Sequence, residues 1–395
     1  MGLFRKGELK LLWPFYLESL IAYIIFFAPV FFIPYFIDIG FSMFQTGLLF
    51  SALMLSQIIM EIPTGVVADL YGRKLSTLLG YIIEGIGFLL IYFVRDFYSI
   101  LFIFILIGLG SSFSSGAKEA WVIDLIKKNN KNLQASYFMK RQSFQYLGII
   151  ASGILGAFFV KNIGLNIIWP MACVSFFISG LILTFGSEFF IEKKRHKNNL
   201  LEACNQAKIS FNYSKNHKVL FYIILASIFL IIAGNFIGPV SGVPLLKSLG
   251  FPNYAIGYFF SLIGLSGIIA PWISNKIYKK GKERKFIFIS IIFSSLISLL
   301  IFFPKTITLV ILFLIASEFC MHMRDPIQRI YFHKHIPSKL RATVGSLESM
   351  LILLGAAIAA PLAGFAVDHI GSRYTIFISG LLFIPAIICY LKIRK

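Results

Sequence analysis

Four polar side chains interrupt one apolar stretch of the chain at the spacing of a helix face. At successive steps of four, three and four residues, the stretch carries Glu318, His322, Asp325 and Arg329. With about 3.6 residues per turn, these side chains share one side of a helix. A carboxyl group one turn from an imidazole can take up and release protons. Glu318 and His322 are therefore candidates for a proton or substrate site.

The chain also repeats itself once. Pro29 to Ser51 matches Pro239 to Ser261 without a gap at eight positions, at a spacing of 210 residues. A second match relates residues 133–164 to residues 340–371 at a spacing of 207. Both matches describe two halves of nearly equal size, which is typical of a protein built by internal duplication.

The repeat spacing gives the polar face a counterpart in the first half. A shift of 207 residues makes Lys118 the counterpart of Asp325, and Glu119 lies about 100° further round the same helix. Charged side chains in an apolar stretch must face inward or pair with one another. Two interpretations stay open. Lys118 and Asp325 belong to a substrate or proton site, or they pair with each other across the pseudo-twofold axis and, together with Arg329, make salt bridges that close the inner gate.

The composition is that of a protein that faces lipid. Hydrophobic residues make up 58% and charged residues 14% of the 395 residues, which leaves too little polar surface for a soluble globule. Apolar runs long enough to cross a hydrocarbon core of about 30 Å cover residues 11–37, 43–68, 75–94, 98–124, 137–160, 165–190, 219–246, 254–274, 285–304, 307–332, 342–367 and 374–391. The sequence predicts an all-α integral membrane protein with twelve transmembrane helices in two parallel six-helix repeats.

Most of the positive charge falls on one side of these predicted helices. Of the 37 Lys and Arg residues, 29 lie in the ends and loops on the side of the N-terminus and five in the opposite loops. The positive-inside rule therefore predicts a multi-pass protein of the cell membrane with both termini in the cytoplasm. The net charge of +20 reflects this topology and an attraction to anionic lipid. No nucleic-acid-reading motif accompanies the charge, so no nucleic-acid partner is expected.

The polar parts of the chain predict a linker and no catalytic domain. Residues 191–218 form one long polar segment, which we interpret as a cytoplasmic linker between bundles 1–190 and 219–395. The first apolar run lacks a small-residue cleavage site and is expected to stay as a helix. The four cysteines are scattered singly and predict neither a disulfide nor a metal site. Without a nucleophile and base, a phosphate loop or a ligand set, we expect no enzyme activity, cofactor or metal.

A loop after the second apolar run has an unusual spacing of glycine and charge. It carries Gly65, Asp69, Gly72, Arg73 and Lys74. This Gly-x-x-x-Asp-x-x-Gly-Arg-Lys pattern resembles the signature loop of the major facilitator superfamily. The position of the loop and the two-by-six repeat agree with the resemblance, which covers the whole chain. An ordinary basic turn is the alternative, but such a turn does not need this spacing.

The resemblance implies roles for particular residues. In this superfamily the loop locks the cytoplasmic side when the protein faces outward, and Asp124 stands where the carboxylate partner of Arg73 would be. Helices 1, 4, 7 and 10 line the central cavity in the family, which adds Glu18 and Asn235 as candidates for the substrate or proton site. Glu84 falls in a helix that is peripheral in the family, so it is expected to pack against other helices.

The resemblance also implies a secondary active transporter that works by alternating access. Drug-proton antiporters of the superfamily usually carry an Arg before Gln-Gly in helix 4 and a Gly-Pro pair in helix 5, and this chain has neither. We expect a monomer that couples proton movement to the efflux of a small organic or amphipathic molecule. The alternatives are proton-coupled uptake of a small polar metabolite and a lipid-handling membrane protein of the same fold.

Overall fold

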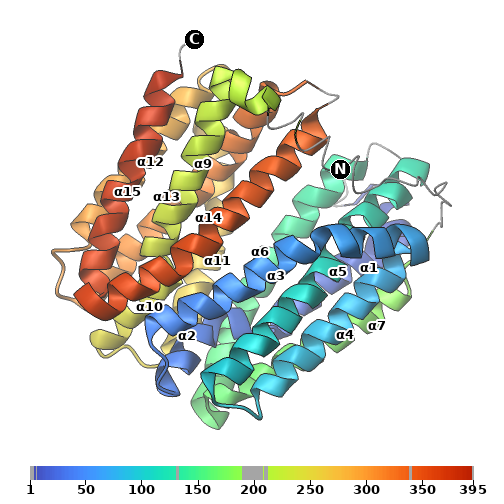
Figure 1. Cartoon of the computed structure of the whole chain (residues 1–395), viewed down its shortest axis with the longest axis horizontal. Helices are drawn as coiled ribbons and strands as arrows, with labels where there is room; N and C mark the ends of the chain where they lie inside the picture. The colour runs from blue at the N-terminus through green and yellow to red at the C-terminus, as the bar shows by residue number, and fades with distance from the viewer. Residues whose placement is uncertain are drawn as a thin grey trace. The chain divides into compact units, whose positions relative to one another are not determined.

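The computed structural model describes residues 4–5, 7–129, 133–188, 208, 212–337 and 340–393, and this part of the chain is almost entirely helical (Figure 1). The helices are α1 (Glu8–Ile25), α2 (Ala28–Asp38), α3 (Met43–Tyr71), α4 (Arg73–Ile91), α5 (Phe97–Asn129), α6 (Leu133–Ile163), α7 (Ile168–Thr184), α9 (Lys218–Ile237), α10 (Pro239–Ser248), α11 (Ala255–Ile277), α12 (Glu283–Leu300), α13 (Ile307–Lys334), α14 (Arg341–Ile370) and α15 (Ser372–Lys392). A single 3₁₀ turn, η1 (Leu165–Ile167), precedes α7. The predicted all-α class is confirmed.

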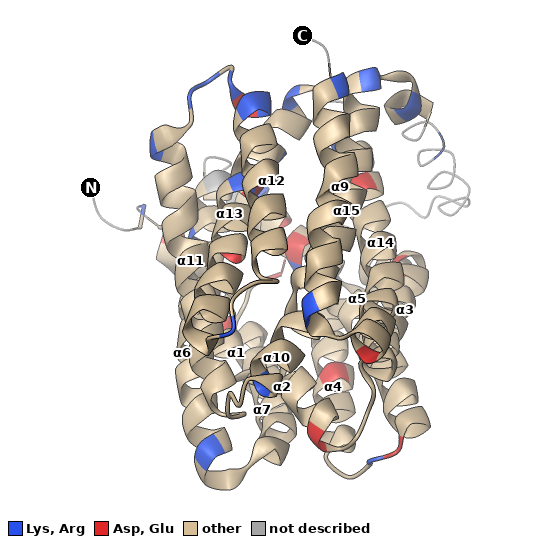
Figure 2. Cartoon of the chain, turned by 90° about the vertical axis from the view of Figure 1, so that its left-hand side faces the viewer, with Lys and Arg blue, Asp and Glu red and all other residues tan. Residues whose placement is uncertain are grey.

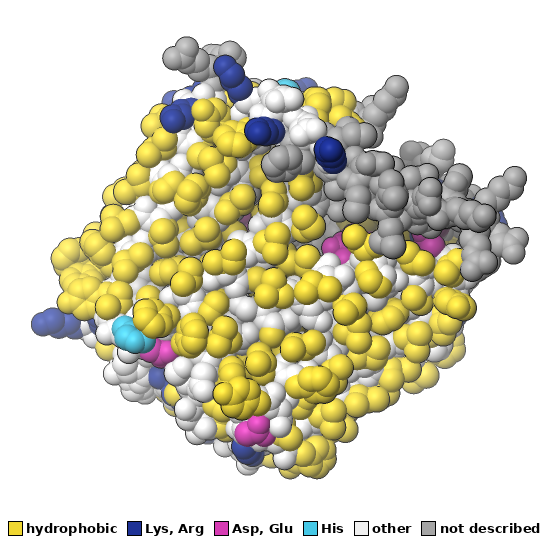
Figure 3. All heavy atoms as spheres, viewed as in Figure 1, with side chains coloured by type: hydrophobic (Ala, Val, Ile, Leu, Met, Phe, Trp, Pro, Cys, Tyr) yellow, Lys and Arg dark blue, Asp and Glu magenta, His cyan; other side chains and the backbone are white. Residues whose placement is uncertain are grey.

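The outer surface of these helices is apolar. Large hydrophobic side chains are strongly exposed on several helices, including Ile59 at 65%, Leu181 at 62% and Ile358 at 61%. Hydrophobic side chains predominate among the described residues on the face drawn in Figure 3. An apolar surface of this extent is stable against lipid and not against water. The chain is therefore a multi-pass membrane protein.

The predicted spans correspond to the helices with two qualifications. Eleven helical segments of the described residues are long and apolar enough to cross a membrane. The remaining predicted span, 285–304, corresponds to α12, which begins with the charged residues Glu283, Arg284 and Lys285 and is only 18 residues long. The first and seventh spans are each two helices in succession, α1 with α2 and α9 with α10. Pro239 begins α10 directly after the extended Gly238, because proline lacks the N–H that would continue the preceding helix.

Contacts divide the chain into two compact units. Unit 1 comprises Met1–Tyr35, Ala52–Arg195 and Asn253–Leu265, and unit 2 comprises Phe36–Ser51, His196–Pro252 and Ser266–Lys395. The predicted bundles, 1–190 and 219–395, remain a prediction. Most of the predicted linker, 191–218, lies outside the described residues.

Each unit has its own core. In unit 1, α4 packs along α5 and α7, and α1 packs along α6 and α7 (Figure 1). Its centre is aromatic and aliphatic, with Phe15, Trp121 and Tyr137 almost completely buried. In unit 2, α15 packs along α9 and α12, and α12 packs along α13. Figure 2 shows Lys and Arg gathered at the ends of α9, α12 and α15 near the C-terminus, and these basic ends agree with the cytoplasmic side predicted for them.

Two short segments belong to the unit opposite to their neighbours in sequence: Phe36–Ser51 lies in unit 2 and Asn253–Leu265 in unit 1. These exchanged segments make equivalent contacts in the two units. In unit 2, Ser51 of α3 donates a hydrogen bond to the carbonyl oxygen of Ala357 in α14. In unit 1, Ser261 of α11 donates to the carbonyl oxygen of Ile150 in α6, at 2.8 Å. The serines are 210 residues apart and the acceptors 207, so the sequence repeat spacings relate both bonds.

Glycines allow the close approach of helices at these contacts. A Cβ atom on Gly47 would lie 2.5 Å from the carbonyl oxygen of Ala360 in unit 2, and one on Gly257 would meet the carbonyl oxygen of Gly153 in unit 1. Real side chains do not tolerate such distances, so both positions require glycine. The matches found between Pro29–Ser51 and Pro239–Ser261 therefore have a packing cause.

Candidate functional site

A buried ion pair lies between three helices of unit 1. The ammonium group of Lys118 in α5 lies 2.9 Å from Oε1 of Glu18 in α1. It also donates a hydrogen bond of 2.7 Å to the hydroxyl group of Tyr81 in α4, and that hydroxyl group donates to the same Glu18 oxygen. The side chain of Glu18 is 3% exposed and that of Lys118 is 15% exposed. Two sequence candidates, Glu18 and Lys118, are thus brought together.

Two neighbouring carboxylates of unit 1, Glu84 and Glu119, have hydrogen-bond or ion-pair partners of their own. Glu84 is buried and accepts a hydrogen bond of 2.8 Å from the hydroxyl group of Ser114. Glu119 pairs with Arg141 at 3.3 Å and is 55% exposed. The structure therefore places Glu119 with a partner of its own, although it follows Lys118 in sequence.

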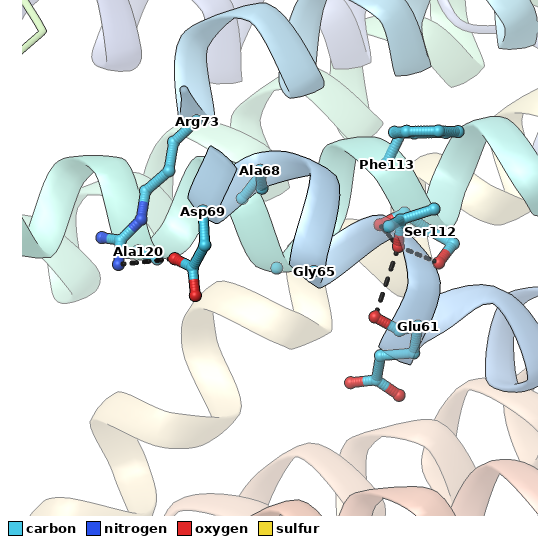
Figure 4. Close-up of a pocket in the computed structure, with 11 residues that line it drawn as sticks. Glu61, Gly65, Ala68, Asp69, Arg73, Ser112, Phe113 and Ala120 are labelled. Atoms are coloured by element: carbon cyan, nitrogen blue, oxygen red, sulfur yellow. Dashed lines mark hydrogen bonds and ion pairs between the residues drawn. The ribbon is translucent and has the colours of Figure 1, made fainter. Parts of the chain in front are cut away.

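The signature loop lies where α3 turns into α4. Arg73 donates a hydrogen bond to Asp124 of α5, and a second carboxylate, that of Asp69, lies 3.9 Å from the guanidinium group. Figure 4 shows Arg73 and Asp69 joined at one end of a cavity that Gly65 also lines. The cavity has a volume of about 240 Å³ and lies between α3 and α5. The role of these residues as a lock stays a prediction.

A carboxylate that the sequence reasoning missed supports this loop. Glu188, which follows α7, accepts a hydrogen bond of 2.9 Å from the backbone N–H of Lys74. That N–H lies in the first turn of α4, where it has no partner within the helix, and a negative charge there is favourable. Gly72 turns the chain with a φ of 105°, a backbone conformation that favours glycine. The ammonium group of Lys74 donates to the carbonyl oxygens of Thr184 and Gly186 at 2.6 and 2.9 Å.

Unit 2 contains a cavity between α9, α13 and α14. It has a volume of about 390 Å³. Asp325 and Arg329, two members of the predicted polar face of α13, line it, whereas Glu318 and His322 are not among its lining residues. Asn235 of α9 donates a hydrogen bond of 2.9 Å to the carbonyl oxygen of Ile231, one turn back in its own helix. Asp325 and Arg329 of the predicted polar face of α13 thus line this cavity, and Glu318 and His322 of the same face do not.

The sequence reasoning missed several side chains that line this cavity. Gln328 donates a hydrogen bond of 3.0 Å to the hydroxyl group of Ser227, which donates in turn to Glu348 of α14 at 3.1 Å. Arg324 also lines the cavity and is 4% exposed. The sequence contained a signal for two of these residues. Arg324 is an arginine within a predicted membrane-spanning helix, where a charge is costly. Glu348 is related by the repeat spacing of 207 to another charged residue, Arg141.

Lys118 and Asp325 fall in different units. The structure gives each of them a partner within its own unit: Lys118 pairs with Glu18, and Asp325 lies 3.7 Å from Arg324. Their pairing with each other stays a prediction.

Comparisons with known proteins agree with this architecture. The sequence profile of the Major Facilitator Superfamily matches residues 16–347 and 279–395. A relative from Bacillus subtilis (strain 168), the uncharacterized MFS-type transporter YxaM, is 26% identical over 381 residues, which span 92% of this chain and 90% of that protein.

Solved transporters share the fold. The nucleoside transporter NupG superposes with a TM-score of 0.79 at 14% sequence identity, covering 97% of this chain and 99% of that one. A POT family transporter in complex with 5-aminolevulinic acid gives a TM-score of 0.74 at 15% identity, covering 95% of this chain and 93% of that one. At these identities the likeness concerns the fold alone. With the profile match over most of its length, the chain belongs to the Major Facilitator Superfamily and is a membrane transporter of that family.

Proposed function

We propose that this transporter couples proton movement to the export of a small organic molecule. In this proposal it works by alternating access, as a monomer in the cell membrane with both termini in the cytoplasm. The observation that carries the proposal is the ion pair of Glu18 and Lys118, which is buried among membrane-spanning helices. Charges are costly there, so a buried ion pair within the membrane-spanning helices is an expected mark of a functional site.

The pair offers a physical route from protonation to rearrangement. A proton on Glu18 would cancel its charge and so remove the carboxylate that lies 2.9 Å from the ammonium group of Lys118. An unpaired buried cation is unfavourable, so protonation would favour a conformation in which Lys118 finds another partner. Asp325 is the partner predicted by the sequence repeat.

Glu318 is the second candidate for the proton site. It lies in α13, is partly buried, and is close enough to Arg324 and Asp325 to interact with their charges. His322, one turn further along, is a second group on the same helix face that can exchange protons. The candidate acceptors are therefore Glu18 in unit 1 and Glu318 in unit 2.

Export is supported by the sparse polar lining of the first and seventh spans, where Glu18 and Asn235 are the candidates. Proton-coupled uptake of a small polar metabolite is the second candidate function. It is favoured by the polar residues of the cavity in unit 2, among them Ser227, Gln328 and Glu348.

Reconstituted vesicles with a trapped pH-sensitive dye test the proposal. Amino acids, nucleosides, carboxylic acids and cationic dyes are added outside, and the internal pH is followed. Antiport makes the interior more alkaline as the solute enters, and symport makes it more acidic. The expected result is solute-dependent alkalinisation, and solute-dependent acidification would instead establish uptake.

Two variants locate the coupling site in the same assay. Glu318→Gln and Glu18→Gln each mimic a protonated carboxyl group. The variant at the coupling site should keep solute exchange and lose solute-dependent proton movement, and His322→Ala should only shift the pH dependence. Wild-type proton movement in both Gln variants, or solute transport without proton movement in the unmutated protein, would overturn the proposed coupling.

A further inference from the structure

Unit 2 contains a buried guanidinium group whose hydrogen-bonding capacity is largely unused. Arg324 lines the cavity of about 390 Å³ and is 4% exposed. Among the residues that the structure describes, its Nε and Nη1 atoms have no hydrogen-bond partner. Its Nη2 atom lies 3.7 Å from Oδ1 of Asp325, which is longer than a hydrogen bond.

Two other arginines of the same unit, Arg284 and Arg373, donate hydrogen bonds to backbone carbonyl oxygens. Arg284 donates to the carbonyl oxygens of Tyr390 and Leu391 at 2.9 and 3.2 Å. Arg373 donates to three carbonyl oxygens after α12, the shortest at 2.6 Å from that of Pro304. A guanidinium group keeps its charge and has five N–H donors. Buried N–H donors without acceptors are costly, and the ion pair of Arg324 with Asp325 at 3.7 Å leaves those on Nε and Nη1 unused.

Other polar side chains also line the cavity. They include the carboxylates of Asp325 and Glu348 and the guanidinium group of Arg329. Gln328 donates a hydrogen bond to Ser227, and Ser227 donates one to Glu348, so these three side chains are already bonded to one another. Within the described part of the chain, Oε1 of Gln328 is buried and accepts no hydrogen bond. The residues that line the cavity therefore include a cation with unused donors and an amide with an unused acceptor, and all of these atoms are buried.

The size and the apolar lining of the cavity fit a small solute. Leu230, Ile231 and Ile352 are among the apolar side chains that line it. Its volume of about 390 Å³ is within the usual range for small-molecule sites, which combine apolar walls with a few polar groups. Guanidinium groups bind carboxylate and phosphate groups strongly because the donors match both shapes.

We propose that Arg324 binds the carboxylate or phosphate group of a small organic anion, and that Oε1 of Gln328 accepts a hydrogen bond from the same molecule. This inference rests on the proposed function in that it names the class of transported solute. It does not depend on proton coupling or on the direction of transport.

The first test needs no knowledge of the solute. Arg324→Met removes the charge and keeps much of the apolar stem. If the guanidinium group is reserved for a ligand, the ligand-free variant should melt at a higher temperature than the wild type in detergent, because buried N–H donors without acceptors are gone. The carboxylate of Asp325, which loses its ion-pair partner, is 52% exposed and can be hydrated. Lys305→Met removes one exposed positive charge and should leave the melting temperature unchanged. A lower melting temperature for Arg324→Met would make Arg324 a structural residue and overturn the proposal.

The second test measures binding with matched probes. A ligand that binds only the folded protein raises its melting temperature. Succinate, benzoate and inorganic phosphate are compared with the neutral succinamide and benzamide on wild type, Arg324→Met, Arg324→Lys and Lys305→Met. At least one anion should raise the melting temperature of the wild type and of Lys305→Met. The same anion should raise that of Arg324→Lys by less and should leave that of Arg324→Met unchanged. Equal effects of the anions and their amides would overturn the proposal.

A lipid phosphate is the other source of the same chemistry. Phosphatidylglycerol in mixed micelles is therefore included as a separate probe. Stabilisation by this lipid together with no effect of the soluble anions would assign Arg324 to a headgroup and overturn a solute site. Anion binding in detergent together with no proton movement in vesicles would reject the proposed coupling and leave this site standing.

Discussion

The ammonium group of Lys118 and the carboxylate of Glu18 lie 2.9 Å apart in unit 1, although the two residues are 100 positions apart in the chain. Tyr81 contacts both groups through its hydroxyl oxygen and comes from a third helix. The pair therefore joins α1, α4 and α5 in the interior of the unit. Its surroundings make it sensitive to any change in the charge of either partner.

Removing one charge of this pair should destabilise the protein, and removing both should cost less than the sum. We expect Glu18→Gln or Lys118→Met to lower the free energy of unfolding by about 3 kcal/mol, because each leaves the other charge buried and unpaired. The double variant should recover part of that loss. Unfolding of the four proteins in detergent measures the coupling, and strictly additive losses would contradict an energetic pair.

The signature loop should matter for conformational switching more than for folding. Asp69 is 41% exposed, and ion pairs of exposed side chains contribute only about 0 to 1 kcal/mol. Asp69→Asn and Arg73→Ala should therefore abolish most transport and leave the protein folded, with ligand affinity in detergent little changed. Lys127→Ala, an exposed cation at the end of α5, is the control. Wild-type transport rates in both loop variants would disprove the lock.

The predicted pairing of Lys118 with Asp325 requires a charge-swap experiment. Lys118→Asp would place a second carboxylate beside Glu18, so the swap is made in a Glu18→Gln background. There, Lys118→Asp combined with Asp325→Lys should transport better than either single change, because the swap restores one positive and one negative group. If the swap is no better while all variants are well expressed, the two residues do not pair.

The glycines at the exchanged segments should not tolerate a methyl group. Gly47→Ala and Gly257→Ala place a Cβ atom against the backbone of a neighbouring helix, and such overpacking typically costs about 1 to 3 kcal/mol. Gly116→Ala, with open space around its Cβ position, should be neutral or slightly stabilising because alanine favours helix. Melting temperatures of the three variants check this expectation. A loss of stability for Gly116→Ala as large as for the other two would refute the packing explanation.

Local chemistry and periodicity were enough to predict the class of this protein. Long apolar runs can satisfy their backbone only as helices in lipid, and the sequence accordingly predicted the spans from composition and length. The sequence repeat also matched Ser51 with Ser261, and in the structure both serines donate to a carbonyl oxygen of a closely packed helix. The signature loop was recognisable by its spacing of glycines and charges. One of these glycines, Gly72, has a backbone conformation that favours glycine.

The resemblance to the family implied that Arg73 meets Asp124, as it does in the structure, but the tertiary structure decided which polar side chains meet in the interior of unit 1. The sequence paired Lys118 with Asp325 by symmetry, whereas the fold places Glu18 and Tyr81 beside it, contacts that depend on how three helices pack and rotate. The sequence shows that Arg324 lies within an apolar run. Its burial and its unused hydrogen-bond donors are visible only in the structure. Helical periodicity reports which residues share a face of one helix, but the neighbours of that face are set by packing between residues distant in the chain. For this reason the spans were readable from the sequence and the partners of the charges inside them were not.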